Sequence, residues 1–202
     1  MSKFREALKN CFGEERLHQI ESVKVGIAGA GGLGSNIAQC LVRSGFTQMV
    51  LVDFDKVDYT NLNRQFYFLK QVGEPKVEAL KKNLQQINPD VSISAVKEKL
   101  DESNIKEVFA DCQVVVEAFD NARCKRILVE SFVNSKKLIV SASGIAGWGN
   151  SDVIKVRRIK ENFYIVGDMV SEVAENCPPV SPRVNVVAAK QADVVLNWVL
   201  NN

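Results

Sequence analysis

The glycine run at residues 29–34, Gly-Ala-Gly-Gly-Leu-Gly, limits the fold of this chain more than any other feature. It follows an apolar run at 23–28, a predicted strand, and precedes a helix-period segment at 35–44. Glycines in a strand-to-helix turn let the backbone approach a phosphate, and the helix N-terminus offers unpaired N–H groups. The alternative is a tight turn without a ligand. The predicted phosphate-binding glycines are Gly29, Gly31, Gly32 and Gly34.

Apolar runs alternate with helix-period segments as far as Ser141, which is the pattern of repeated βα units. Runs such as MVLVD, VVVEA and LIVSA lack polar alternation, as expected of parallel strands covered on both faces. The predicted strands are 23–28, 49–53, 91–96, 114–118 and 138–141, and the predicted helices are 35–44, 74–87, 104–110 and 122–134. We expect an α/β fold, doubly wound and Rossmann-like, with a mostly parallel sheet.

The pattern changes after Ser141. A glycine-rich turn is followed by predicted strands at 152–159 and 163–166, then by a loop and an amphipathic helix at about 183–200. These segments predict a small antiparallel C-terminal extension. Repeats and low-complexity linkers are absent from the sequence, so we expect residues 1–202 to form a single domain.

Asp53 ends the second predicted strand, where a carboxylate accepts hydrogen bonds from ribose hydroxyls. It would repel the 2′-phosphate of NADP, but it does not separate NAD from ATP. A dehydrogenase usually offers a proton-transfer residue, yet the only histidine, His18, lies outside the predicted sheet. An NAD-dependent oxidoreductase therefore remains an alternative.

The polar residues after Asp53 favour a triphosphate. Asn61, Arg64 and Gln65 follow Asp53 and Asp55, and a guanidinium is a donor fork suited to phosphate. Alternatively, the arginine is a solvated surface charge and the two amides are turn residues.

Two further charges belong to the same predicted edge of the sheet. Lys76 begins a predicted helix after Pro75, and Asp120 follows the strand at 114–118. Magnesium prefers such a carboxylate together with phosphate oxygens. The alternatives are a surface lysine and a helix N-cap at Asp120.

The motifs GAGGLGS, DFDxVxxxNLNRQF, GxPKVEAL, INP and AFDN resemble those of the ThiF/HesA/MoeB family, over roughly residues 20–200. The resemblance implies a carboxylate-activating adenylyltransferase that uses ATP and Mg²⁺. The same matching implies phosphate-turn glycines at 29, 31 and 34, ribose binding by Asp53, metal binding by Asp120, and triphosphate binding by Asn61, Arg64, Gln65 and Lys76.

The implied partner is a small ubiquitin-like sulfur-carrier protein that ends in Gly-Gly. Short proteins of this type favour the thiamine carrier, and a molybdopterin or other carrier stays open. The family also implies a homodimer. Two other functions remain alternatives: a non-catalytic nucleotide-binding or carrier-docking subunit, and dehydration of a tRNA threonylcarbamoyl group.

The sequence departs from the family in three respects, one of which is a C-terminal region shorter than in typical relatives. Paired CxxC motifs are missing, so we expect no zinc. The N-terminal RYxRQ segment, whose arginine reaches across a family dimer, is also not recognisable, and neither Arg5 nor Arg16 matches it.

Cys177, in the segment ENCPP before the last helix, resembles the crossover-loop cysteine of ThiF-type proteins. A persulfide or acyl-linked catalytic role is one interpretation, and a loop thiol without function is the other. Cys40 and Cys124 lie on predicted helices, where we expect small core residues. Cys11 and Cys112 carry no signal.

The composition does not favour a highly charged partner such as nucleic acid or a membrane surface. The 26 basic and 24 acidic residues give a net charge of +2 and are spread along the chain without a basic stripe, so nucleic acid is not expected as a partner. No apolar run reaches the roughly 18 residues of a membrane span. We expect a cytoplasmic protein that does not bind membranes.

Overall fold

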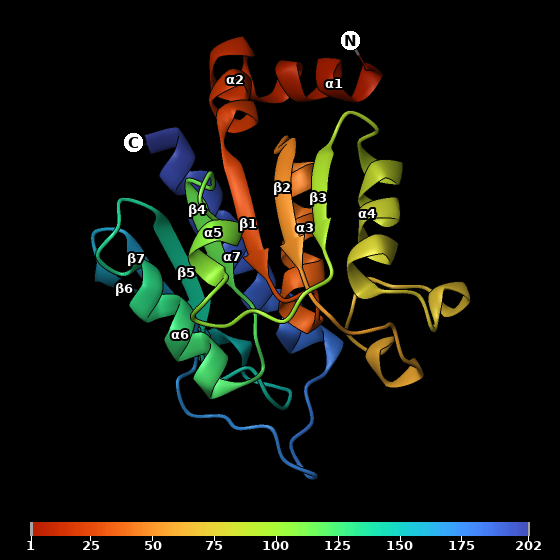
Figure 1. Ribbon diagram of the computed structural model, residues 1–202, viewed down its shortest axis with the longest axis vertical. Helices are drawn as coiled ribbons and strands as arrows, with labels where there is room; N and C mark the ends of the chain where they lie inside the picture. Colours follow the sequence, from red (N-terminus) through yellow and green to blue (C-terminus); the bar gives the residue numbers. More distant parts are fainter. Residues whose placement is uncertain (1, 202) are drawn as a thin grey trace.

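A single seven-stranded sheet forms the centre of the computed structural model, which describes residues 2–201 (Figure 1). The strand order is β3-β2-β1-β4-β5-β7-β6, and every neighbouring pair is parallel except β6 with β7. The strands are β1 (Lys24–Ala28), β2 (Gln48–Val52), β3 (Ser92–Val96), β4 (Val114–Glu117), β5 (Leu138–Ala142), β6 (Lys155–Lys160) and β7 (Phe163–Gly167). This topology confirms the predicted fold class.

The antiparallel extension continues the main sheet. After β5 the chain runs out to form the edge strand β6 and returns as β7 between β5 and β6. β6 begins at Lys155, three residues later than predicted, because Ser151–Val153 forms a short 3₁₀ turn instead. The predicted strands were right in order and type, and their ends shifted by a few residues.

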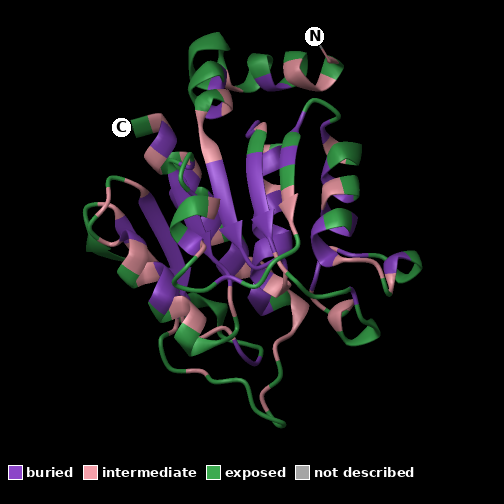
Figure 2. Cartoon of the chain, in the orientation of Figure 1, coloured by how far each residue is buried: buried purple, intermediate pink, exposed green. Residues whose placement is uncertain are grey.

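Helices cover both faces of the sheet (Figure 1). One face carries α3 (Gly32–Arg43), α4 (Lys76–Ile87) and α7 (Ser181–Asn201), and the other carries α5 (Ile105–Val108) and α6 (Ala122–Phe132). Figure 2 shows the strands as the most deeply buried part of the chain. The continuous apolar runs of the sequence thus end up buried on both sides, as a parallel sheet requires.

Two N-terminal helices were not predicted from the sequence. α1 (Lys3–Phe12) and α2 (Glu14–Ser22) lie at the amino-terminal end of the strands (Figure 1). Only Leu8, Leu17 and Ile20 of these helices are buried, so their apolar stripe is too narrow to stand out in a charged segment. Arg5 joins the two helices through ion pairs with Glu14 and Glu21.

The order of the strands creates a crevice at their carboxyl ends. From β1 the chain moves to β2 and β3 on one side, and it then crosses to β4 and β5 on the other. At this switch point the loops after β1 and β4 diverge onto opposite faces, which leaves room for a ligand between them. The glycine turn follows β1, so it opens into this crevice.

None of the helices within residues 2–201 is both long and apolar enough to cross a membrane.

Phe109 is the large residue on which the α5–α6 face depends. Its ring is fully buried, packs edge-on against Phe132, and occupies the space that a side chain at Gly26 would need. We predict that Phe109→Ala lowers the free energy of unfolding by about 3–5 kcal/mol, because it leaves a cavity beneath β1. Urea denaturation followed by circular dichroism measures this loss. A loss below about 1 kcal/mol would contradict the packing described.

Candidate nucleotide-binding site

The glycine turn brings α3 unusually close to β1. Gly29 has a φ of +102°, and a Cβ on it would lie 2.8 Å from the carbonyl oxygen of Ala118. A Cβ on Gly34 would lie only 1.8 Å from the carbonyl oxygen of Gly29. These two glycines are therefore required by the turn itself.

Gly31 and Gly32 serve the turn differently. A Cβ on Gly31 would meet only the Nε2 atom of Gln65, at 3.9 Å, so the missing side chain leaves space open to the crevice. Gly32 begins α3 and lies against Val184 of α7, whose Cγ1 atom would be 3.3 Å from an added Cβ. The N-terminus of α3 has no side-chain cap, so its first N–H groups are available to an anion.

Asp53 fixes the other side of the turn. One carboxylate oxygen accepts a 2.7 Å hydrogen bond from the backbone N–H of Ala30, and the other accepts a 2.8 Å bond from that of Asp55. The side chain is half-buried and still lines the crevice. The same carboxylate thus orients the glycine turn and faces the ligand space.

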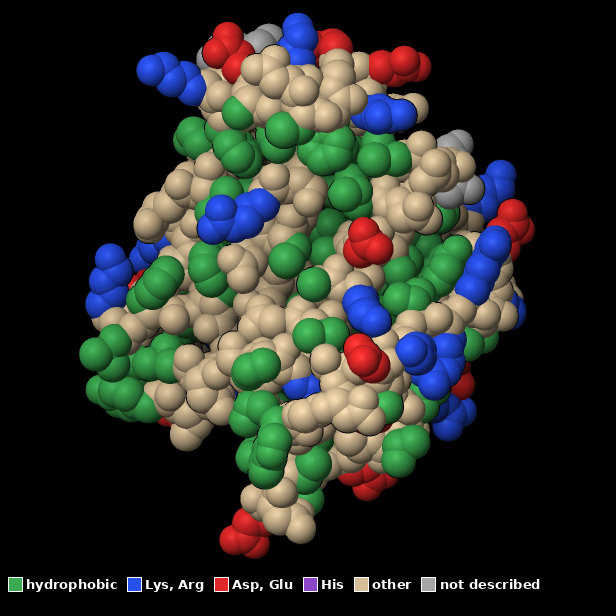
Figure 3. Space-filling model, turned by 180° about the vertical axis from the view of Figure 1, so that it is seen from behind, with side chains coloured by type: hydrophobic (Ala, Val, Ile, Leu, Met, Phe, Trp, Pro, Cys, Tyr) green, Lys and Arg blue, Asp and Glu red, His purple; other side chains and the backbone are tan. Residues whose placement is uncertain are grey.

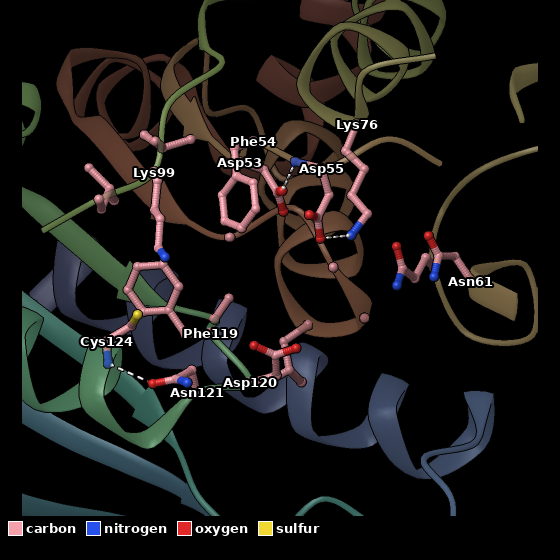
Figure 4. Close-up of a pocket in the computed structure, with 18 of the residues that line it drawn as sticks. Asp53, Phe54, Asp55, Asn61, Lys76, Lys99, Phe119, Asp120, Asn121 and Cys124 are labelled. Atoms are coloured by element: carbon pink, nitrogen blue, oxygen red, sulfur yellow. Dashed lines mark hydrogen bonds and ion pairs between the residues drawn. The ribbon is translucent and has the colours of Figure 1, made fainter. Parts of the chain in front are cut away.

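The crevice holds a cavity of about 820 Å³, which is within the usual size range of small-molecule sites. Figure 4 shows Asp53, Asp55 and Lys76 along one side of the cavity, Asn61 at one end and Asp120 on the opposite side. Of the eleven predicted nucleotide-binding and metal-binding positions, only Gly34, which lies beneath the turn, is absent from the cavity wall. The other ten line it: Gly29, Gly31, Gly32, Asp53, Asp55, Asn61, Arg64, Gln65, Lys76 and Asp120. The sequence-predicted residues are thus brought together, and their individual roles remain proposals.

Lys76 and Asp55 form an ion pair inside this cavity. The Nζ atom of Lys76 lies 2.9 Å from a carboxylate oxygen of Asp55, and the lysine side chain is only 8% exposed. The lysine begins α4, two residues later than the predicted start of this helix at residue 74, with Pro75 directly before it. Lys76 is therefore a buried cation rather than a solvated surface charge.

The segment after β2 presents an amide and a guanidinium to the cavity. Arg64 donates through NH1 to the carbonyl oxygen of Thr60 and to the side chain of Asn63, which holds the guanidinium in place. Burial lowers the pKa of Arg64, and the nearby carboxylate of Asp120 offsets part of this shift. Both predicted charges face the same space.

Asn61 and Gln65 differ in how they are used. Asn61 accepts a hydrogen bond from the N–H of Asp58 and so stabilises a 3₁₀ turn, which agrees in part with its alternative interpretation as a turn residue. Gln65 is buried, and its Oε1 atom has no hydrogen-bond partner among the described residues. A buried amide with one unsatisfied end is uncommon and marks a place where a ligand or water completes the bonding.

Asp120 is exposed at the cavity mouth and is not the N-cap of α6. The cap is Asn121, whose side chain accepts from the N–H groups of Arg123 and Cys124. Among the described residues, no group of three or more His, Cys, Asp or Glu side chains is arranged to hold a metal. A magnesium ion here would need phosphate oxygens in addition to this carboxylate.

The sequence reasoning missed the apolar end of the cavity. Phe54, Lys99 and Phe119 line it, each from a loop that follows the carboxyl end of a strand. Such loops at the carboxyl edge of a parallel sheet are where ligands bind, so this position was the available signal.

The expectation that Cys124 is a small core residue is wrong. It lies on α6 as predicted, but its half-buried side chain lines the cavity and does not pack in the core (Figure 4). Cys40 does pack against the main core from α3, and burial raises its pKa.

Cys177 lies in the loop between β7 and α7. The backbone groups of Ala174 and Cys177 bond to each other, which closes a tight turn. The sulfur atom packs against Gly147, where an added Cβ would be 2.9 Å away. Val173 and Pro179 of the same loop line the cavity, so Cys177 belongs to a segment that borders the nucleotide site.

The surface charge is mixed overall, but one strand is strongly basic. Figure 3 shows acidic and basic side chains interspersed on the rear face. The sequence did not indicate a basic stripe, yet the edge strand β6 carries Lys155, Arg157, Arg158 and Lys160. These closely spaced residues form a basic surface because β6 is an edge strand with a neighbouring strand on only one side.

The chain is similar to known proteins along most of its length. A model of the ThiF family matches residues 4–202. The molybdopterin-synthase adenylyltransferase of Salmonella typhimurium is 28% identical over 192 residues, which are 93% of this chain and 77% of that protein.

The tRNA threonylcarbamoyladenosine dehydratase of Bacillus subtilis is 35% identical over 136 residues, or 66% of this chain and 54% of that protein, so the chain matches only about half of its length. Among solved structures, the Escherichia coli tRNA N6-threonylcarbamoyladenosine dehydratase in complex with ATP has a TM-score of 0.83 at 22% identity, covering 96% of this chain and 91% of that one. That likeness supports the fold.

Gly31 and Gly34 of the glycine run give a matched pair of variants. We predict that Gly31→Ala folds with almost unchanged stability but binds ATP at least about tenfold more weakly, because the methyl group enters space open to a phosphate. Gly34→Ala should lower the melting temperature strongly, because its Cβ overlaps the carbonyl oxygen of Gly29. Differential scanning fluorimetry with and without ATP separates the two effects. Equal behaviour of the variants would be inconsistent with this division of roles.

Proposed function

The chain belongs to the ThiF family, and from this premise we propose that it uses ATP to adenylate the C-terminal carboxylate of a small ubiquitin-like sulfur-carrier protein ending in Gly-Gly. The thiamine carrier is the favoured partner. We also propose that the protein is a single-domain cytoplasmic enzyme that acts as a homodimer. The observation that carries the proposal is the set of cations, amides and carboxylates that faces one cavity across a glycine turn.

The proposed reaction is a displacement at phosphorus. An oxygen of the carrier carboxylate forms a bond to the α-phosphorus of ATP, the bond from that phosphorus to the bridging oxygen breaks, and pyrophosphate leaves with the bonding electrons. The product is an acyl adenylate. Such a transfer needs little covalent chemistry from the protein, which contributes orientation and charge stabilisation.

The proposed roles follow the positions of the residues. The glycine turn and the N-terminus of α3 would hold phosphate, and Asp53 would bind the ribose. Arg64 and Lys76 would neutralise charge on the leaving pyrophosphate, with Asn61 and Gln65 donating amide hydrogen bonds. The position of the Gln65 Nε2 donor supports this assignment, because that atom would lie 3.9 Å from a Cβ on Gly31 and so borders the open space at the phosphate turn. Its buried Oε1 atom, which has no partner among the described residues, would accept from a hydroxyl group or a water.

Magnesium fits the site through one carboxylate. Asp120 lies exposed across the cavity from Lys76, and no hydrogen bond among the described residues engages its side chain. A magnesium ion bound there would draw its other ligands from phosphate and water, and it would supply charge neutralisation at the phosphates. We assign Asp120 to holding it.

For Cys177 we propose a covalent step after adenylation. Its thiolate would attack the acyl carbon of the adenylate, and AMP would leave as the thioester forms. The loop position beside the cavity supports this step. In the other form of the proposal, the Cys177 thiolate takes a sulfane sulfur from a persulfide donor, which is left as a thiol, and the terminal sulfur of the resulting persulfide attacks the acyl carbon as AMP leaves.

A second candidate function is activation of the threonylcarbamoyl carboxylate on tRNA. The specific observation that favours it is the basic edge strand β6, since clustered lysine and arginine side chains attract a phosphate backbone. Dehydratases of this class are among the relatives. A non-catalytic nucleotide-binding or docking subunit is less favoured, because every ATP-site residue expected from the family pattern is present in the chain. An NAD-dependent oxidoreductase is less favoured, because it leaves Arg64, Lys76 and Asp120 without a role.

The decisive experiment is ATP–pyrophosphate exchange with magnesium, measured with a Gly-Gly carrier, with tRNA, and with neither. We predict exchange that depends on the carrier, and a loss of about 10²–10³-fold in Asp120→Ala, since one charge-stabilising group is removed. Asp152→Ala, a carboxylate outside the cavity, is the matched control and should keep full activity. Exchange stimulated by tRNA alone would favour the second function, and ATP binding without exchange would favour a docking subunit.

Cys177→Ser separates the two proposed steps. We predict that pyrophosphate exchange persists at the parent rate, while any carrier adduct stable in denaturant and cleaved by thiols disappears. Intact-mass spectrometry detects the adduct. Loss of exchange in this variant would mean that Cys177 supports the nucleotide site and is not a nucleophile.

A further inference from the structure

The loop that carries Cys177 is tied at both ends by one buried ion pair. Asp168 directly follows β7, and Arg183 lies in the first turn of α7. Their side chains are 9% and 8% exposed and form a close contact between the carboxylate and the NH2 group. The contact therefore joins the point where the chain leaves the sheet to the point where it enters the last helix.

Asp168 organises the start of the loop. Its Oδ1 atom accepts 2.8 Å hydrogen bonds from the N–H groups of Val170 and Ser171. These bonds hold Met169 at a φ of +67°, a conformation that costs energy for a residue with a side chain. Burial raises the pKa of Asp168, but the hydrogen bonds from Ser171 and Val170 and the contact with Arg183 outweigh it and lower the pKa to about 2, so the carboxylate is ionised at neutral pH.

Arg183 connects three segments. NH2 contacts Asp168, while NH1 donates a 2.9 Å hydrogen bond to the carbonyl oxygen of Gly149 in the loop after β5. The Nε atom is buried without a hydrogen-bond partner among the described residues, so the guanidinium leaves one of its possible hydrogen bonds unmade. Arg183 also precedes Val184, which packs on Gly32 at the phosphate turn.

The loop after β5 is the surface on which Cys177 rests. Gly147 donates a hydrogen bond to the carbonyl oxygen of Pro178, and the sulfur of Cys177 packs on the same glycine. Ala146 donates to the hydroxyl of Ser171. The ion pair thus clamps the two loops together on either side of the cysteine, whereas Glu172 and Glu175 between these contacts are exposed.

We propose that Arg183, through its ion pair with Asp168, is a positioning residue that holds Cys177 beside the nucleotide cavity. The proposal rests on the proposed function of Cys177. With the clasp formed by Arg183 and Asp168 intact, the sulfur stays shielded by Gly147 at the border of the cavity. Without it, the loop moves away from the cavity, and the cysteine reacts with solvent reagents faster but with an acyl adenylate more slowly.

The first test measures the loop itself, without any substrate. In Arg183→Met, alkylation of Cys177 by iodoacetamide and cleavage after Glu172 and Glu175 by a glutamate-specific protease should each accelerate by about tenfold, because local opening becomes more frequent. Peptide mass spectrometry assigns both sites. Lys190→Met is the matched control: Lys190 lies on the same helix and bonds the carbonyl oxygen of Ile154, outside the loop, so neither rate should change.

The second test measures the reaction. Arg183→Met should keep carrier-dependent pyrophosphate exchange within about twofold of the parent, because neither Arg183 nor Asp168 bonds to a proposed ATP-binding residue. It should form the Cys177 adduct about tenfold more slowly. Arg183→Lys retains the charge and should recover part of the adduct rate. If Arg183→Met fails to fold, Arg183→Lys and Asp168→Asn are compared instead, the latter keeping an acceptor for Val170 and Ser171.

The outcomes separate this inference from the proposed function. Unchanged alkylation and proteolysis in a folded clasp variant would overturn the positioning role. A general loss of melting temperature together with equal losses of exchange and adduct would also overturn it, since the pair would then be a structural staple only. If the parent protein shows no exchange but the loop responds as predicted, the clasp stands and the adenylation proposal fails.

Discussion

The close approach of α3 to β1 is the constraint on which the rest of the site depends. The first turn of the helix packs directly on the carbonyl oxygen of Gly29, and only a residue without a side chain at position 34 permits this. The approach points the free N–H groups at the start of α3 into the crevice, and Asp53 locks the turn in place by accepting from the N–H of Ala30. The other cavity residues lie around this fixed glycine turn.

Residues from distant parts of the chain meet at the glycine turn because the order of the strands in the sheet brings their loops together. The segments after β2 and β4 both end at the carboxyl edge of the sheet, so Arg64 and Asp120 face each other although many residues separate them in sequence. Local features then set each side chain. Asn121, for example, caps α6 and leaves the preceding carboxylate free to face the cavity. The site therefore combines a general property of parallel sheets with a few specific hydrogen bonds.

Much of this was predictable from the sequence. The unbroken apolar runs indicated the parallel strands, and the glycine turn with Asp53 indicated the crevice, because both follow from backbone geometry. The amphipathic helices α1 and α2 were missed, since their buried stripe amounts to three residues. The apolar end of the cavity was missed as well: Phe54 and Phe119 look like ordinary hydrophobic residues until the strand ends bring them to one space. The basic strand β6 became a surface feature only through its place at the sheet edge.

The ion pair between Lys76 and Asp55 has a consequence for how the cavity receives a phosphate. In the proposed ATP site the lysine already has a counterion, so a phosphate that bound to Lys76 would displace a carboxylate instead of meeting a bare charge. Binding is then an exchange of one anion for another on the same buried ammonium group. Because the cation stays compensated throughout, its contribution depends on the local geometry more than on the long-range field, and added salt screens a short contact of this kind only weakly. The arrangement favours a ligand that fits the turn over an anion that is merely strongly charged.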